Sequence, residues 1–488
     1  MLNFEDVKEL AQVIKQRGGR ALLVGGYVRD QLMGRESKDF DLEVFGLELA
    51  TLSSELIAFA QLKHEKLSTV GQSFQVVKVG LNLDVSVPRR DRKVGEGHKG
   101  FEIDGDPYMS TIDAARRRDF TMNALLLDPL TGQIFDHFTG RADIDAKLVR
   151  VVDPDTFVED SLRALRAVQF ASRFGFGIAT KTFELIQSMD LRDLPRERVW
   201  GEIEKWLMQS EKPSHGLFLM QQLGILEKLF PEIENLVGVP QDMRWHPEGD
   251  VFVHTALALD VAKTAVAGLP YPEQVTVMLA TLCHDLGKAE TTEIHEFVGG
   301  VEVSSRKYGE SFFPHDLATE QRVTAHGHAE AGVSLARNVL DRLAVHSIEG
   351  YDVRGQVLAL VENHLAPFEF HRHPPRDSAF RRLALKVDLN LLHKVAHADA
   401  HSRNGNSLGR VFGTEGQDWF LDKIQNLSIP PKGPDRILMG RHLIELGVKP
   451  SKRMGEILDK VFEAQIEGTV TDVESGLALA RQIIAEDA

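Results

Sequence analysis

Features typical of membrane and secreted proteins are scarce in this 488-residue chain. It has no apolar run of about 18 residues or more, the length that a helix needs to cross a bilayer. Its first residues include acids, where a secretion signal would have basic residues followed by an apolar stretch. Its single cysteine, Cys283, excludes an intramolecular disulfide and a metal cluster held by thiolates. We therefore predict a cytoplasmic protein in which Cys283 is a small core residue.

Positive charge is also in short supply. With 57 lysines and arginines against 72 acids, the formal net charge is −15, which argues against a protein whose whole surface binds nucleic acid. Two short basic clusters, residues 89–93 and 116–118, are the exceptions. Phosphate binding depends on local potential, so these clusters are candidates for contacts with nucleic acid, and a solvated charged surface is the alternative for each.

The chain is too long for one core, and its apolar pattern changes near residue 150. Before that point, residues 21–24, 74–79 and 81–87 read as strands among helices; after it, helical spacing continues to the end. Residues 292–325 lack clean periodicity and are expected to form an inserted loop. We predict an α+β protein, with a small mixed β-sheet in an N-terminal head and all-α domains after it. The predicted domains are residues 1–149, 150–245, 246–409 and 410–488.

The most informative residues are a glycine pair and two aspartates near the N-terminus. Gly25 and Gly26 end an apolar strand, and glycines there let backbone N–H groups approach phosphate oxygens. Asp39 and Asp41 flank an apolar residue, and side chains two apart on a strand point to the same face. Two such carboxylates suit a Mg²⁺ ion that bridges to substrate phosphates. Each half alone is also typical of a plain turn or a half-exposed strand, but together they predict phosphoryl or nucleotidyl transfer.

A third carboxylate, Asp84, lies in another segment that reads as a strand. Three acids on neighbouring strands would complete a site for two metal ions, one activating the attacking hydroxyl and the other steadying the leaving group. Asp84 equally fits an ordinary acid at a strand end. The sequence leaves both readings open.

Four ordered motifs resemble those of one known family. They are LVGGYVRD at residues 23–30, DFDL at 39–42, RRDFTMNAL at 117–125 and EDSLRALR at 159–166. Together they make the chain resemble the tRNA nucleotidyltransferases, the CCA-adding enzymes, within the bacterial class that shares its catalytic head with poly(A) polymerase. The resemblance covers nearly the whole chain. It implies a nucleotidyltransferase head at 1–149, a helical neck and body at 150–245, and a helical tail at 410–488 that helps to bind tRNA.

The resemblance also implies roles for single residues. Asp39, Asp41 and Asp84 would be catalytic, with Mg²⁺ on the first two. The residues that bind the nucleotide would be Gly25, Gly26, Arg29, Arg118, Asp119, Asn123, Asp160, Arg163 and Arg166. Among these, Asp160 and Arg163 would select cytosine and adenine by presenting acceptors and donors to a base edge.

Other readings of these residues remain. Asp160 and Arg163 could form a surface ion pair. Thr156 could cap the helix with Glu159 returning the bond in a capping box, which would make Glu159 structural. Asp119 and Asn123 could belong to a packed helix start.

Residues 91–115 are polar, glycine-rich and long enough to move as a lid. In the family, a flexible loop in this region is needed for the final A addition, and enzymes that add only C have it shortened. Its apparent full length here favours an enzyme that adds A.

A second group of motifs combines histidines with acids. His254 precedes a His284-Asp285 doublet in the segment LCHDLGK, which resembles the HD phosphohydrolases. That resemblance implies a second divalent metal, of unknown identity, held by His254, His284, Asp285 and a distant aspartate, for which Asp399 fits. Imidazole and carboxylate together suit a metal that activates water against a phosphoester. Two further histidines, which would add ligands or serve the substrate, are His326 and His328.

The leading prediction is template-independent addition or repair of the tRNA 3′ CCA end from CTP and ATP. A metal-assisted 3′ hydroxyl would attack the α-phosphate and release pyrophosphate. Enzymes that add only CC, only A or a poly(A) tail share the head motifs and are the alternatives. In a different class, the HD unit would be the main activity and would hydrolyse a 2′,3′-cyclic phosphate or a nucleotide monoester. The three carboxylates and the His-Asp set disfavour a non-enzymatic RNA-binding protein.

Overall fold

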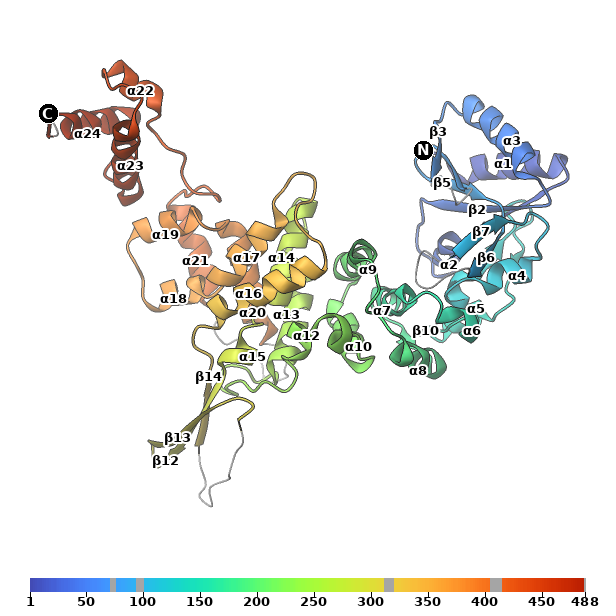
Figure 1. Ribbon diagram of the computed structural model, residues 1–488, viewed down its shortest axis with the longest axis horizontal. Helices are drawn as coiled ribbons and strands as arrows, with labels where there is room; N and C mark the ends of the chain where they lie inside the picture. The colour runs from blue at the N-terminus through green and yellow to red at the C-terminus, as the bar shows by residue number, and fades with distance from the viewer. Residues whose placement is uncertain (71–75, 94–100, 311–319, 404–414, 487–488) are drawn as a thin grey trace. The chain divides into compact units, whose positions relative to one another are not determined.

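The computed structural model describes residues 1–70, 76–93, 101–310, 320–403 and 415–486 (Figure 1). They divide into two units, Met1–Ser210 with Phe218–Leu229 and Glu211–Leu217 with Phe230–Ala488. The predicted α+β class, with a mixed sheet near the N-terminus followed by helices, is confirmed. In the part of the chain that is described, no helix has both the length and the apolar content of a membrane span.

The first unit is built on a seven-stranded mixed sheet. Its strands are β1 (Arg20–Val24), β2 (Phe40–Phe45), β3 (Leu67–Val70), β4 (Val76–Val79), β5 (Leu83–Ser86), β8 (Leu126–Leu127) and β9 (Ile134–Phe135). Their order is β3-β4-β5-β2-β1-β8-β9. The β2–β5 pair is parallel and the other pairs of this sheet are antiparallel. Two smaller pairs are β6 (Arg89–Lys93) with β7 (Phe101–Gly105) and β10 (Leu148–Val149) with β11 (Gly177–Ile178).

The first helix and first strand form as their sequence pattern predicts. Asn3 caps α1 (Phe4–Gln16) by accepting from the backbone N–H groups of Glu5 and Asp6, and the Asp6 carboxylate accepts from the Asn3 N–H. Four of the five β1 residues are buried, as expected of a central strand covered on both faces. The buried residues of α1 are Val7, Leu10, Ala11 and Ile14.

The register of β2 and β5 places two predicted acids side by side. Asp41 lies opposite Asp84, and Phe40 lies opposite Leu83. Because side chains alternate along a strand, Phe40 and Leu83 are buried on one face while the two acids share the other. Asp39 directly precedes β2.

The described residues of the segment 91–115 include strands and a helix, in place of the long loop that their composition suggests. β6 and β7 pair from Arg89↔Gly105 to Lys93↔Phe101, and helix α4 (Thr111–Arg116) follows. Pairing satisfies the backbone groups of both strands, which an open loop would leave to water. Residues 94–100, the centre of the predicted lid, lie outside the described residues.

The other helices of the first unit cover the sheet and extend beyond it (Figure 1). They are α2 (Gly26–Leu32), α3 (Leu49–Leu62), α5 (Gly140–Asp145), α6 (Pro154–Phe157), α7 (Leu162–Phe174), α8 (Thr180–Ser188), α9 (Arg196–Gln209) and α11 (Ile225–Leu229), with the 3-10 turn η1 (Thr121–Asn123). Helix α10 (Pro213–Gln222) contains residues of both units.

The predicted capping box of Thr156 and Glu159 is wrong. Asp153 caps α6 by accepting from Asp155 N, and Pro154 in the first helical position sets its start. Thr156 therefore lies inside α6. Ser161, not Thr156, precedes α7, so Leu162–Phe174 is a separate helix.

The second unit is mainly helical. Its helices up to residue 426 are α12 (Pro231–Glu234), α13 (Val251–Ala265), α14 (Tyr271–Cys283), α15 (Lys288–Thr291), α16 (His328–Arg342), α17 (Val353–Asn363), α18 (Ala366–Arg372), α19 (Asp377–Ala384), α20 (Leu389–Ser402) and α21 (Glu415–Asn426). Helices α13, α14, α17 and α20 pack against one another through buried apolar residues, each worth about 1.5–3 kcal/mol when fully buried. Cys283 ends α14 and is fully buried, as predicted, and burial raises the pKa of its thiol to about 12.

The described residues of the segment 292–325 form three strands and not the predicted loop, and residues 311–319 lie outside the described residues. β12 (Glu293–Val298) lies between β13 (Val301–Lys307) and β14 (Glu320–Thr324), antiparallel to both. The buried positions of β12 are Ile294 and the charged Glu296. With an acid in a buried position, the sequence lacks the apolar-polar alternation that marks a strand.

The C-terminal helices have a hydrophobic cluster of their own. They are α22 (Gly440–Glu445), α23 (Lys452–Glu467) and α24 (Val473–Glu486), and the buried members of the cluster include Leu443, Ile457 and Val461. The preceding residues 430–434 contain neither helix nor strand.

Candidate functional site

A cavity of about 760 Å³ in the first unit gathers most of the predicted site residues. Its walls come from β2, the start of α2, the segment around η1 and one face of α7. The predicted residues that line it are Gly25, Gly26, Arg29, Asp39, Asp41, Arg118, Asp119, Asn123, Asp160, Arg163 and Arg166. Asp84 lies beside Asp41 on the sheet but is not among the lining residues.

The acids of β2 and β5 are placed to bind a cation. Asp39 and Asp41 are exposed on either side of the buried Phe40. Although Asp41 reaches solvent at the cavity wall, desolvation raises the pKa of its carboxyl; Arg118 opposes the shift, and Asp84 and Asp39 add to it. Mutual repulsion of this kind is relieved when a cation binds, and carboxylate oxygens suit Mg²⁺. The residues present therefore fit a divalent metal. Asp84 also forms an ion pair with Lys78, at 3.2 Å, so its second role is to balance the charge of that lysine.

The glycine pair allows an arginine to approach the backbone. Gly25 has φ +66°, and a Cβ atom there would lie 3.1 Å from Nη1 of Arg118. A side chain at this position would be both strained and crowded. The absence of a Cβ therefore keeps Arg118 close to the turn between β1 and α2.

A buried hydrogen-bond network joins the head motifs. Arg29 Nη1 donates to Asn123 Oδ1 at 2.7 Å, and Asn123 Nδ2 donates to Asp119 Oδ1 at 2.9 Å. Arg166 Nε donates to Asp119 Oδ2 at 2.7 Å. Burial alone would raise the pKa of Asp119, but the charge of Arg166 and the hydrogen bonds outweigh it, and the pKa is lowered. The network therefore holds its carboxylate ionised.

The hydrogen bonds distinguish Asp119 from Asn123. Oδ1 of Asp119 accepts from Phe120 N and from Asn123, and Oδ2 lies 2.7 Å from both Nε and Nη2 of Arg166. These contacts use the lone pairs of the carboxylate, whereas Asn123 retains one N–H and one lone pair. Asn123 is thus better placed than Asp119 to contact a ligand directly.

One residue of this cavity, Glu43, was not predicted from the sequence. It is 1% exposed, and its Oε1 lies 2.8 Å from Arg117 Nη2, while its Oε2 lies 3.7 Å from Arg118 Nη2. It orients both arginines toward the cavity. Glu43 lies two residues after Asp41 on the same face of β2, and this spacing is the sequence feature that could have identified it.

Asp160 and Arg163 are each fixed by other partners. Asp160 accepts from Leu162 N and from Arg198 Nη2, both at 3.2 Å. Arg163 donates to the carbonyl oxygens of Thr156 and Arg117, at 2.9 and 3.1 Å. Asp160 precedes α7 and does not lie on it, so the two residues are not the helical neighbours that their spacing suggests.

A second cavity, of about 670 Å³, lies in the helical unit beside a cluster of histidines. Asp285 lies at the centre of the histidine cluster. Its Oδ2 is 3.2 Å from His284 Nε2 and 3.6 Å from His254 Nε2. His254 Nε2 lies 3.2 Å from Asp399 Oδ1. The structure thus brings together His254, His284, Asp285 and Asp399, the four predicted ligands, all at most 4% exposed. His326 lines the cavity, and His328 reaches Asp285 at 3.3 Å.

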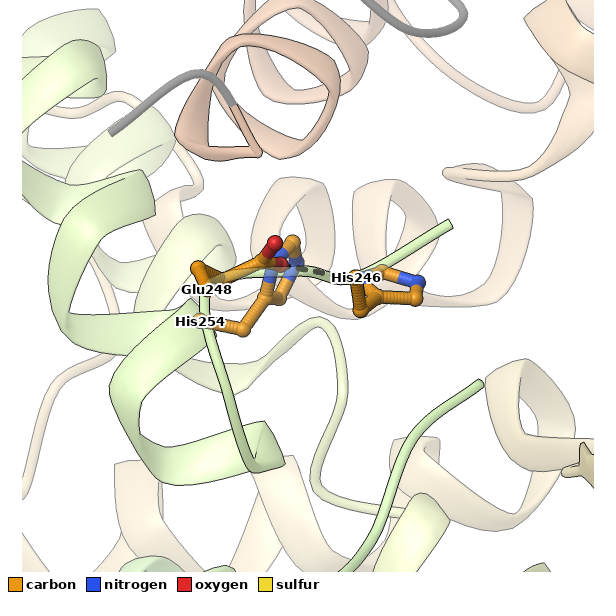
Figure 2. Close-up of side chains that lie close together, drawn as sticks. All are labelled: His246, Glu248 and His254. Atoms are coloured by element: carbon orange, nitrogen blue, oxygen red, sulfur yellow. Dashed lines mark hydrogen bonds and ion pairs between the residues drawn. The ribbon is translucent and has the colours of Figure 1, made fainter. Parts of the chain in front are cut away.

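The imidazoles are oriented by partners behind them. His284 Nδ1 lies 2.7 Å from Thr281 O, so this nitrogen donates and Nε2 is the atom that faces Asp285. Glu248 lies between two rings, with Oε1 2.7 Å from His254 Nδ1 and 2.9 Å from His246 Nδ1 (Figure 2). Burial would raise the pKa of Glu248, but these hydrogen bonds lower it to about 2. Nε2 of His254 and of His284 is buried without a hydrogen-bond partner, as expected of a metal ligand, whereas Oδ2 of Asp285 forms an ion pair with Lys288 Nζ at 2.7 Å.

Sequence reasoning missed one member of this cluster, His364. It follows α17, is fully buried, and lies with Nε2 3.2 Å from His328 Nε2 and 3.9 Å from Asp285 Oδ1. A single histidine in a helical pattern carries no signal of its own. The packing of α14 against α17 makes it a neighbour of the doublet.

Comparison with known proteins gives consistent relatives. Residues 21–150 match the poly A polymerase head domain, and residues 175–236 match a probable RNA and SrmB binding site of polymerase A. The chain is 34% identical to the multifunctional CCA protein of Nitrosococcus oceani over 394 residues, which are 78% of this chain and 85% of that protein. It is 36% identical to the protein of the same name from Pasteurella multocida over 338 residues, 67% of this chain and 71% of that one.

Solved structures share the fold. The Bacillus stearothermophilus CCA-adding enzyme in complex with CTP superposes with a TM-score of 0.62 and 20% identity, covering 99% of this chain and 98% of that one. The Thermotoga maritima CCA-adding enzyme complexed with tRNA superposes with a TM-score of 0.58 and 18% identity, covering 98% and 94%. On these relatives and on the head motifs, the chain belongs to the family of CCA-adding tRNA nucleotidyltransferases that share the poly A polymerase head.

Proposed function

We propose that this protein adds or repairs the 3′-terminal CCA of tRNA, taking nucleotides from CTP and ATP without a nucleic-acid template. The observation that carries the proposal is the single cavity in which an aspartate pair faces an arginine-rich wall. Acids for a cation and arginines for phosphates are the two requirements of nucleotidyl transfer. The named relatives agree with this activity.

The chemistry places the tRNA 3′ hydroxyl and the nucleotide α-phosphate beside the acids of β2. Asp39 and Asp41 would hold Mg²⁺, which supplies positive charge to lower the pKa of the hydroxyl and to offset charge on the phosphate. The hydroxyl oxygen forms a bond to the α-phosphorus as the bond to pyrophosphate breaks. Arg117 and Arg118, both oriented by Glu43, would bind the negative oxygens of the triphosphate.

The network around Asn123 would position the sugar. Asn123 has one free N–H and one free lone pair, which suit a ribose hydroxyl. Asp119 would position Arg166 and Asn123 without contacting the nucleotide itself. We assign it as a positioning residue, which refines the family-based expectation.

Base selection would fall to Asp160 and Arg163 at the start of α7. Arg163 uses two of its five N–H donors on carbonyl oxygens and keeps the others for a base edge. A side chain held in this way can read a base without rearranging. The tail helices would contact tRNA phosphates, with Lys449, Lys452 and Arg453 as candidates. Action in the cytoplasm stays a prediction.

The test uses tRNA transcripts ending at the discriminator base, at C and at CC. Each is incubated with the protein and Mg²⁺, with CTP and ATP singly and together, and the 3′ ends are sequenced. Ordered growth to CCA followed by a stop supports the proposal. Addition only to the CC end would make this an A-adding enzyme, growth that stops at CC would make it a CC-adding enzyme, and continued A addition would make it a poly(A) polymerase. No incorporation on any transcript would overturn the nucleotidyltransferase assignment.

A second function, metal-dependent hydrolysis of a phosphoester, is favoured by the histidine cluster. Its unpartnered imidazole nitrogens, gathered beside the Asp285 carboxylate, fit a transition-metal ion. Lys288, Arg372 and Arg403 line the adjoining cavity and would bind a phosphate. Hydrolysis of 2′,3′-cyclic AMP by the purified protein with Ni²⁺ or Mn²⁺, lost in His284→Ala, tests this function.

A further inference from the structure

Three histidines follow one another along helix α20. His393, His397 and His401 are each four residues apart, so their side chains lie on one face of the helix. The ring centroids of the first two are 6.0 Å apart, and those of the last two are 3.8 Å apart. Asp399, which belongs to the histidine cluster described above, lies two residues from His397 and therefore about 200° around the helix. The three residues, here called the α20 histidines, thus form a group separate from that cluster.

His393 has a buried nitrogen atom that lacks a partner. The residue is 7% exposed, and among the described residues its Nε2 has no hydrogen-bond partner. Buried polar atoms in folded proteins are nearly always paired, so an unpaired one is a place to expect a bound ion or water. His397 and His401 are half-buried, so a ligand can reach this face of α20 from solvent.

An acid on the neighbouring helix completes the set. Asp418 lies on α21, which packs against α20. Burial lowers the pKa of His393 to about 4 and also lowers the pKa of His397, and the charge of Asp418 opposes the shift at both rings. The carboxylate of Asp418 therefore lies near both imidazoles. His401 is instead held against its own helix, with Nδ1 2.9 Å from the carbonyl oxygen of His397.

This combination of groups suits a metal ion. Two histidines four residues apart on a helix can bind one ion from the same face, as in the zinc-binding helices of metalloproteases. With one carboxylate as the third ligand, such a pair holds Zn²⁺ and leaves a position open for water. The first and last of the α20 histidines are about 12 Å apart along the helix axis, too far for one ion to bind all three.

We propose that His393, His397 and Asp418 form a binding site for a divalent transition-metal ion, outside the histidine cluster. Ligands from two helices join α20 to α21, so the bound ion stabilises the folded helical unit. His401 stacks on His397 and holds its ring in place. The site shares no ligand with the proposed phosphoesterase centre and does not depend on that function.

Zinc counts on the full chain test the proposal without using activity. Wild type and variants are stripped with chelator, titrated with Zn²⁺ by calorimetry, dialysed and analysed for bound metal. We expect His393→Gln and His397→Gln each to bind one ion fewer per chain than wild type. His346→Gln, which changes an exposed histidine outside both groups, should bind as many ions as wild type. Each result is a difference from wild type, so it does not depend on how many ions the histidine cluster holds.

An unchanged count in both His393→Gln and His397→Gln would overturn the proposal, and so would loss of the ion in His401→Gln with retention in His393→Gln. If His393→Gln fails to fold, the exposed Asp418 is changed to Asn in its place. The ion must then bind more weakly by about 10-fold or more for the proposal to stand.

The variant His284→Ala separates this site from the proposed phosphoesterase function. It should leave zinc binding by the α20 site at wild-type affinity. Absence of any ion that depends on His284 would overturn the phosphoesterase function and leave the α20 site intact. Loss of the α20 ion in folded His284→Ala would overturn the claim that the two sites are separate.

Discussion

The head cavity and the histidine cluster both suit phosphate chemistry, but the groups that could hold a cation are arranged in opposite ways. In the head, Asp39 and Asp41 are exposed carboxylates at the start of β2, and arginines line the same cavity. In the helical unit, His254, His284 and Asp285 are buried, and partners behind the ligands fix their orientation. Open oxygen sites suit Mg²⁺ that binds with its substrate, whereas buried imidazole sites suit a resident transition metal. The difference predicts that the two sites can be disabled separately.

The largest effect is expected from Asp41→Asn. Removing a charge that holds the cation should reduce nucleotide incorporation by ~10³-fold or more, the scale of loss for an electrostatic group in an active site. Transition-metal content of the helical unit should stay unchanged. Incorporation rates and metal analysis of the same preparation check this, with Asp145→Asn, an exposed acid on α5, as the control. Loss of metal from the helical unit would contradict the separation of the sites.

Next in size is the loss of stability from Arg166→Gln. This substitution leaves the buried Asp119 carboxylate without its ion pair. The free energy of unfolding should fall by about 3 kcal/mol. This is the low end of the loss expected for a buried ion pair, because Arg166 is one-third exposed. Folding lowers the pKa of Asp119, so the ion pair stabilises the folded state at any pH above the pKa of this group in the unfolded chain. That stabilisation is lost as the pH falls through the pKa of Asp119 in the folded protein.

Urea unfolding of wild type and Arg166→Gln at neutral and acidic pH measures this cost, and the difference between them should shrink at low pH. Arg192→Gln, which breaks an exposed pair with Asp190, should give no measurable change. A difference that grows as pH falls would contradict the role of Asp119.

A smaller effect is expected from Glu248→Gln behind the cluster. It keeps the shape but weakens the hydrogen bond to His254, and residues in this position change metal affinity by about 10- to 100-fold. Calorimetric titration with Ni²⁺ should show weaker binding at an unchanged stoichiometry. Unchanged affinity would mean that the orientation of His254 does not depend on Glu248.

The smallest effect is expected from Gly25→Ala in the head. The Cβ would lie 3.1 Å from Arg118, so the arginine must move, and the KM for CTP and ATP should rise roughly 10-fold, the effect of losing about one charge-assisted hydrogen bond. Gly34→Ala is the matched control, because Gly34 has nearly the same positive φ, +67°, with nothing within 4 Å of its Cβ. Equal KM values for the two variants would show that backbone strain alone is responsible.

The two sites also differ in how far the sequence predicts them. The head acids were predictable because Asp41 and Asp84 lie on strands, and Asp39 directly before one, so that the alternation of side chains reveals a shared face. The histidine cluster was only partly predictable, since His364 joins Asp285 through helix packing that no local pattern records. The sheet at 293–324 was missed because Glu296 occupies a buried position, and the capping box failed because Pro154 starts a separate short helix.

The most direct test of two independent sites compares wild type, Asp41→Asn and His284→Ala in two assays of the same preparations. One assay follows CTP and ATP incorporation into a tRNA transcript that lacks CCA, and the other follows hydrolysis of 2′,3′-cyclic AMP with Ni²⁺. We predict that Asp41→Asn loses only incorporation and that His284→Ala loses only hydrolysis. Loss of both activities in either folded variant would contradict the account.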